Sequence, residues 1–339
     1  MIREGDVTDS TRPPEQPQAV VWSWPHALIG VVYAIPAAAV ALRDPGSGIP
    51  LAVGVLPAVF VGIPPRRRAR IVILIIGVLA GASIFLGSVL AHLPLIATVA
   101  LLVAAVIGAA VLASVLPAGR IVLVLCAPLV AAGLSYPDYS HSAETFLLLS
   151  LGSAYAYLVS LAWPPRSAKQ RTQTPLPPRQ AMLDYGVRMG LAAAIVYAIA
   201  TGLELDHPGW APAACLLVAR PQLDLLQSRG VGRVLSVVGG AVAAALLLRA
   251  NPSNYVFTIL AIVVLAVAAG TIGSRWYITS AFTTLLVFVM LLNGHPEETV
   301  GKFNERVGET ILGVAAAYLF GWAVPALRVR VKARRQAPT

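Results

Sequence analysis

Charged residues are scarce in this sequence. Asp, Glu, Lys and Arg together make up 12% of its 339 residues, whereas apolar residues make up 58% and the mean hydropathy is +0.78. A soluble domain carries roughly a quarter of its residues as charges. The composition therefore excludes an ordinary soluble protein and indicates a chain whose surface faces lipid.

Motifs for nucleotide binding and hydrolysis are missing as well. The chain has no G-x4-G-K-[ST] loop, no His-Glu-x2-His, no G-x-S-x-G and no dinucleotide fingerprint after a strand. We therefore expect no enzymatic activity, no cofactor and no direct use of ATP. Active transport would then draw on a proton or charge gradient, or on a partner protein.

The sequence also has few cysteines and no residue spacing typical of a metal site. The two cysteines, Cys126 and Cys215, lie in apolar runs, which favours small buried side chains over a disulfide. Most histidines fall in predicted outer loops, and carboxylates flank some of them, but without the ligand spacing of a metal site. We expect no bound metal. A membrane enzyme acting on lipid-linked substrates, the least favoured alternative, would have to use this outer-loop cluster: Glu204, Asp206, His207, Glu297 and Glu298.

Long uncharged runs, by contrast, recur along the whole chain. Their lengths approach the roughly 17–25 residues that cross a bilayer as a helix, so we predict an all-α polytopic membrane protein with about twelve transmembrane helices. The predicted helices are 24–42, 49–63, 71–91, 95–116, 121–136, 144–163, 183–203, 209–221, 231–250, 255–272, 276–293 and 305–326. The ranges 49–63 and 209–221 are short and contain proline, so they are expected to be broken or tilted.

A basic, Pro-rich segment divides the chain into two halves of similar length. Such a segment cannot lie in hydrocarbon as a helix. The predicted organisation is a disordered cytoplasmic tail, a first six-helix repeat, a cytoplasmic linker, a second six-helix repeat and a basic cytoplasmic tail, with these bounds: 1–22, 23–164, 165–181, 182–327 and 328–339.

The two halves repeat several residues at nearly constant spacing. The matching sets are Arg70, Gly77 and Gly81 with Arg233, Gly240 and Ala244, and Gly152, Tyr157 and Pro164 with Gly313, Tyr318 and Pro325. These matches predict an internal duplication. Six helices in each half would give the two repeats the same orientation in the membrane.

The chain has a net charge of +10, and its basic residues cluster in the short loops between the predicted helices. This distribution is typical of a membrane protein rather than of a nucleic-acid-binding protein. With both termini cytoplasmic, all but four of the 25 Lys and Arg residues fall at the inner face. This distribution agrees with the positive-inside rule, by which cytoplasmic loops carry an excess of Lys and Arg. We expect a multi-pass protein of the inner (plasma) membrane that binds membrane lipids and no nucleic acid.

A few charges fall inside the predicted helices, where they are costly and usually functional. Arg306 and Glu309 are three residues apart, share a helix face and can form an ion pair. They are the leading candidates for binding an anion and, with Glu305, for coupling its movement to protons. The alternative is an interfacial ion pair that only orients the helix.

Other candidates for substrate binding lie near the predicted inner face or at helix ends. They are Arg188, Arg233, Arg275 and Trp210. A guanidinium binds a carboxylate through two parallel hydrogen bonds, and an aromatic ring can stack on an aromatic acid. The alternatives are snorkelling to lipid phosphates for Arg70 and Arg233, and interface anchoring for the tryptophan.

Two segments resemble the fusaric-acid-resistance-like (FUSC) family of the aromatic acid exporter superfamily, which also includes plant anion channels. They are HPGWAPAACLLVARPQLDLLQSRGVGRVLSVVGG over His207–Gly240 and FNERVGETILGVAAAY over Phe303–Tyr318, and Arg66–Gly81 is a weaker copy of the first. The resemblance implies efflux of aromatic or other weak carboxylic acids. Exporters of this family typically carry large cytosolic domains, and some use periplasmic adaptors, whereas this chain has only a short linker between its halves.

The sequence thus favours a membrane transporter that exports a small organic anion between its two repeats. Its predicted partners are lipids and that anion, with homo-oligomerisation and an adaptor left open. A passive anion channel and a membrane assembly or scaffold protein without flux are the alternatives.

Overall fold

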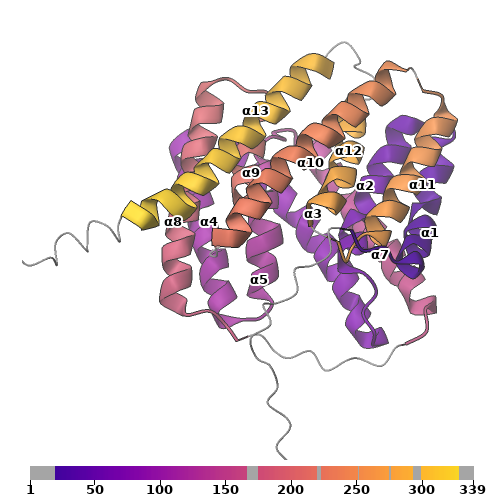
Figure 1. Ribbon diagram of the computed structural model, residues 1–339, viewed down its shortest axis with the longest axis horizontal. Coiled ribbons are helices and arrows are strands. Elements are labelled where there is room, and N and C mark those ends of the chain that lie inside the picture. Colours follow the sequence, from indigo (N-terminus) through magenta and orange to yellow (C-terminus); the bar gives the residue numbers. More distant parts are fainter. Residues whose placement is uncertain are drawn as a thin grey trace, which may run out of the picture.

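The computed structural model describes residues 20–165, 175–219, 223–250, 252–274, 276–292 and 299–327. Within these ranges the chain is all-α and forms twelve helices, counting consecutive α and π segments as one (Figure 1). The helices of the first half are α1 (Trp24–Ala41), α2 (Pro45–Val61), α3 (Ile71–Ala91), α4 (Leu95–Val115), the continuous α5 (Gly119–Ile121), η2 (Val122–Cys126) and α6 (Ala127–Gly133), and α7 (Tyr139–Ala162). Those of the second half are α8 (Arg179–Gly202), α9 (Trp210–Val218), α10 (Leu223–Arg249), α11 (Asn254–Gly270), α12 (Trp276–Leu292) and α13 (Thr299–Tyr318), which continues into η4 (Leu319–Ala323).

Seven of these helices are long and apolar enough to cross a membrane, and four more are shorter apolar helices. The multi-pass membrane character predicted from composition is therefore supported. The exception is α9, whose nine residues extend only roughly 14 Å at 1.5 Å per residue. A bilayer core is about 30 Å thick, so α9 does not cross it as a helix by itself.

Helix positions agree with the sequence prediction, but five helices begin at least four residues earlier than predicted: α2, α7, α8, α10 and α13. Helix α7 starts at Tyr139, where the Asp138 side chain accepts a hydrogen bond from the Ser140 amide at 2.9 Å. Hydrogen bonds from Ser140 lower the pKa of Asp138, which keeps this N-cap ionised. Helices α10 and α13 also extend into polar sequence, because the prediction followed apolar runs and their first turns are polar.

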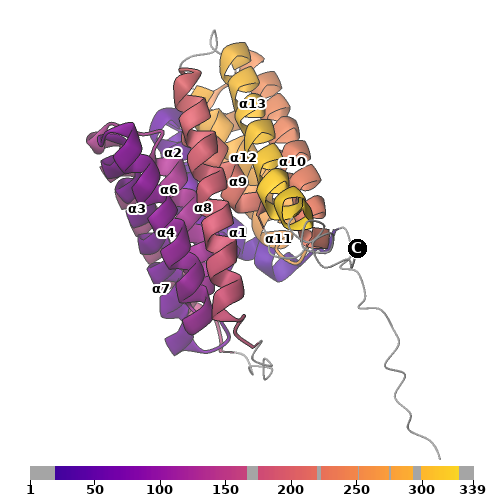
Figure 2. The ribbon, with the colours of Figure 1, turned by 90° about the vertical axis from the view of Figure 1, so that its left-hand side faces the viewer.

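Several helix contacts in the first half have a counterpart in the second half. Helix α2 packs on α7 as α9 packs on α13, and α3 packs on α7 as α10 packs on α13. Between the halves, α1 lies along α11 and α4 lies along α8; these contacts are visible in Figures 1 and 2. Each half therefore contacts the other through both its first and its fourth helix.

Small residues allow the closest of these contacts. A side chain on Gly152 would collide with the backbone of Gly54 in α2, and one on Gly313 would collide with the Ala211 carbonyl in α9. Gly77 likewise faces Ser153 without room for a side chain. These glycines let the helix backbones approach closely, as small residues do between membrane helices.

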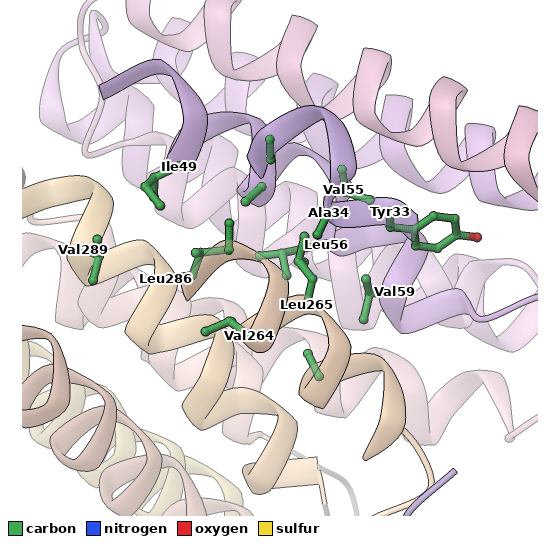
Figure 3. Close-up of a cluster of buried hydrophobic side chains, with 14 of the residues drawn as sticks. Tyr33, Ala34, Ile49, Val55, Leu56, Val59, Val264, Leu265, Leu286 and Val289 are labelled. Carbon is green, nitrogen blue, oxygen red and sulfur yellow. The ribbon is translucent and has the colours of Figure 1, made fainter. Parts of the chain in front are cut away.

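The largest apolar core joins the two halves. Side chains of α1 and α2 interlock with those of α11 and α12, including Tyr33, Ile49 and Val55 from the first half (Figure 3). Leu265 and Leu286 face them from the second half and are fully buried. This core fixes α2 and α12 beside each other, and both helices line the cavity described below.

Candidate functional site

A cavity of about 240 Å³ lies between the two halves. Its walls come from α2, α3, η2–α6 and α7 of the first half and from α9, α10, α12 and α13 of the second half. These are the second, third, fifth and sixth helices of each half. The cavity thus collects the sequence-predicted residues Trp210, Arg233 and Arg306 at one place.

Arg306, on the second turn of α13, is buried, with 6% of its surface exposed. Its Nη1 lies 3.3 Å from Oε2 of Glu309, which confirms the pairing predicted from their spacing. Its guanidinium lies 3.5 Å over the centroid of the Trp210 ring, a cation–π contact between α13 and α9. Its Nε is buried and has no hydrogen-bond partner among the described residues.

Arg233 is the second guanidinium of the cavity. The sequence placed it at the cytoplasmic start of its helix, as a candidate for substrate binding with snorkelling to lipid as the alternative. Helix α10 begins ten residues earlier, roughly 15 Å along the axis. The side chain is buried, and its Nη1 donates to the Ser280 hydroxyl of α12 at 3.0 Å. Its Nε likewise finds no partner in the part of the chain that the structure describes. Arg233 and Arg306 are close enough to interact electrostatically.

Aromatic rings cover one end of the cavity. Tyr136, in the turn between α6 and α7, meets Trp210 edge-on with ring centroids 6.2 Å apart and lies 5.4 Å from the His141 ring. Burial raises the pKa of Tyr136 to about 12, so the phenol stays protonated. The Trp210 Nε1 is buried and makes no hydrogen bond of normal geometry within the described ranges.

The acidic candidates lie beside the cavity rather than in its lining. Glu309 is 1% exposed, and its Oε1 has no hydrogen-bond partner among the residues described. Glu305 accepts a hydrogen bond from the His207 backbone amide at 3.0 Å, which ties α13 to the turn before α9. Both carboxylates interact electrostatically with Arg306.

The remaining candidates are not part of this cavity. Arg188 in α8 donates to the Phe320 carbonyl of η4 at 3.3 Å and is absent from the lining. Arg275, like Glu297 and Glu298 of the outer-loop cluster, lies outside the described residues. Within the described ranges, no group of three or more His, Cys, Asp and Glu side chains could hold a metal ion.

Arg70, the counterpart of Arg233 in the first half, does not snorkel. It is fully buried and donates to the carbonyl groups of Pro64, Ser160, Trp163 and Pro164. The last three carbonyls belong to the C-terminal end of α7 and the residues after it, which need donors. Arg70 therefore stabilises that helix end.

Several lining residues were not singled out from the sequence. They are Tyr136, His141, Thr283 and Thr284. Ser280, which accepts a hydrogen bond from Arg233 but does not line the cavity, was not singled out either. The three hydroxyl residues in α12 interrupt an apolar helix, and this was the signal that could have identified them.

The arrangement is suited to an anion. Two buried guanidinium Nε groups are donors without partners, and no carboxylate lines the cavity among the described residues. A buried donor left unpaired is costly, and a ligand with only acceptor oxygens would satisfy it. Carboxylates bind guanidinium groups in this way.

No match to the chain was found among curated proteins or among solved structures. A family model described as fusaric acid resistance protein-like matches residues 191–320, which confirms the resemblance predicted from sequence. The matched part contains Trp210, Arg233 and Arg306 of the cavity. Residues 191–320 of this polytopic membrane protein thus form a fusaric acid resistance protein-like domain.

Proposed function

We propose that this protein moves a small organic anion across the membrane and binds it in the cavity between Arg233 and Arg306. One observation carries the proposal: two buried guanidinium groups, each with an unpartnered Nε, line the same cavity. Among the described residues, neither guanidinium has partners that accept hydrogen bonds from all of its N–H groups. A buried charge of this kind is costly unless a ligand compensates it, so these residues indicate a binding site rather than a packing role.

The chain crosses the membrane as two parallel six-helix repeats in this proposal, α1–α7 and α8–α13. Support comes from the matched residue spacings and from the equivalent helix contacts within and between the halves. Helices α2 and α9 occupy the same position in each half, both contain proline, and both line the cavity, but only α9 is too short to cross the membrane. A short or broken helix at a binding site is common among transporters built from repeats.

The protein lies in the plasma membrane with both termini cytoplasmic. The support is the clustering of Lys and Arg in alternate loops, which the positive-inside rule places in the cytoplasm. In this orientation Trp210, Tyr136 and Arg306 lie toward the outer side of the membrane. The direction of transport is export, as the family description "fusaric acid resistance" suggests for its members.

Glu309 is the proton-coupling residue. Its carboxylate is fully buried and uses one oxygen to pair with Arg306, so protonation would weaken the ion pair and free a donor of Arg306 for the anion. A proton and an anion would thereby bind together, which links anion movement to the pH gradient. A passive channel would lack this dependence.

The test is the flux of radiolabelled aromatic and aliphatic carboxylates in proteoliposomes, with and without an imposed pH gradient. Flux that depends on the pH gradient supports the carrier. Flux driven only by voltage assigns the same cavity to a channel. Absence of flux for every acid would overturn the proposal and leave the scaffold role.

A further inference from the structure

The two halves line the cavity with different chemistry. Of the side chains described at the cavity, the second half supplies all the cationic ones, Arg233 and Arg306, and also Trp210, Thr283, Thr284 and the apolar Val287 and Phe288. From the first half come mainly aliphatic and aromatic side chains of α2, α3, η2 and α6. Among the described residues that line the cavity, the first half supplies no Lys, Arg, Asp or Glu.

The polar side chains of the first half are confined to one end of the cavity. Tyr136 and His141 lie beside each other, and Tyr136 meets the Trp210 ring. Thr145, the third, is one turn after His141 on α7 and donates to its carbonyl at 3.0 Å. These residues therefore adjoin Trp210, and the rest of the first-half wall is apolar.

That apolar wall is continuous. Ala80, Ile84 and Leu149 form a buried cluster, and Leu125 and Leu129 pack against it. All five side chains line the cavity. A charged or strongly polar group placed here would lose its hydration without gaining a partner.

The described cationic side chains of the cavity come from the second half alone. Arg233 and Arg306 are the only Lys or Arg side chains among the described residues that line it, and they lie close enough to interact electrostatically. A carboxylate bound beside them would have cationic partners. A second carboxylate of the same ligand, placed against the first-half wall, would be buried without one.

We infer that the cavity selects singly charged amphipathic anions and holds them in one orientation. The carboxylate faces Arg233 and Arg306, the apolar body lies against Ile84, Leu125 and Leu129, and a second charge at the far end of the ligand is rejected. This inference rests on the proposed function and specifies its substrate class. It makes the apolar first-half wall the determinant of specificity.

Three ligands of matched length separate charge from size: hexanoate, adipate and monomethyl adipate. Each is tested for binding to the purified full-length protein by calorimetry, and as a competitor of radiolabelled hexanoate flux in proteoliposomes at neutral pH. The expected result is that hexanoate and monomethyl adipate bind with similar affinity and adipate binds roughly tenfold or more weakly. Adipate binding as tightly as its monomethyl ester would overturn the inference while leaving the proposed function intact. Failure of all three ligands to bind or move would overturn both.

A variant should reverse the selectivity. Leu129→Lys places a cation on the apolar wall, so it should raise adipate affinity relative to hexanoate, and the matched control Leu129→Met should keep the selectivity of the wild type. If Leu129→Lys does not fold, Leu125→Lys tests the same wall, and the three-ligand comparison on the wild type is decisive without any variant. A folded lysine variant with unchanged preference for hexanoate over adipate would contradict the assignment of this wall.

Discussion

The Arg306 guanidinium lies 3.5 Å over the Trp210 ring and thereby covers one face of it. The Tyr136 ring meets the same indole at an interplanar angle of 79°, with ring centroids 6.2 Å apart. From sequence, Trp210 was a candidate to stack directly on an aromatic substrate. Its contact with Arg306 instead indicates that it positions the guanidinium whose Nε remains available in the cavity.

Substitutions of Trp210 should therefore act through Arg306. Trp210→Ala removes a cation–π contact worth about 1–2 kcal/mol when buried, so the half-saturating anion concentration should rise about tenfold. Trp210→Phe keeps a ring under the guanidinium and should cause a smaller rise. Flux kinetics of both variants in proteoliposomes check this order. Equal kinetics for Trp210→Ala and the wild type would show that the stack does not support binding.

Glu309→Gln should separate anion binding from proton coupling. The substitution keeps the shape of the side chain and removes its negative charge, so the positive charge around the cavity increases. We expect stimulation of flux by a pH gradient to be lost, while anion affinity at fixed pH stays the same or increases. Gradient stimulation equal to that of the wild type would rule out Glu309 as the coupling residue.

Arg233→Lys tests whether charge alone is sufficient at the second cationic position. Lysine keeps the positive charge but lacks the planar set of donors of arginine. In the wild type, Nη1 of Arg233 donates to Ser280 and Nε has no partner among the described residues. Anion affinity should fall severalfold in Arg233→Lys and further in Arg233→Ala. Calorimetric titration with a monocarboxylate measures both, and wild-type affinity in Arg233→Ala would remove this residue from the site.

Arg70→Ala should destabilise the protein without changing its selectivity. The loss of a buried donor to four carbonyl groups leaves them unsatisfied, at a cost of about 3 kcal/mol or more. Thermal unfolding in detergent should show a clear fall in Tm. The matched control is Arg67→Ala, an exposed position of the same basic segment, which should leave Tm unchanged. An equal Tm for Arg70→Ala and Arg67→Ala would contradict the role assigned to Arg70.

The sequence predicted what depends on local pattern. Apolar runs located the helices, and the three-residue spacing of Arg306 and Glu309 predicted their ion pair, because both follow from helical geometry. The position of Arg233 could not be predicted in the same way. The preceding turns are polar, so the apolar run placed the helix start too late and Arg233 at the membrane surface.

The partners of the site residues depend on contacts between distant helices. No local pattern connects Ser280 of α12 with Arg233 of α10, or Tyr136 with Trp210. Likewise, Arg70 and Arg233 occupy equivalent sequence positions but differ in role, because only Arg70 lies within reach of the carbonyl groups at the end of α7. The surroundings created by the fold, rather than the residue type, distinguish the helix cap from the candidate binding residue.

The most direct test of the anion-binding cavity is carboxylate flux into proteoliposomes containing wild type, Arg306→Ala or Arg188→Ala, at equal amounts of folded protein. Arg188 is the matched control because it is an arginine of a spanning helix that does not line the cavity. We expect Arg306→Ala to abolish flux and Arg188→Ala to retain it. Wild-type flux in Arg306→Ala would contradict the central claim that this cavity binds the transported anion.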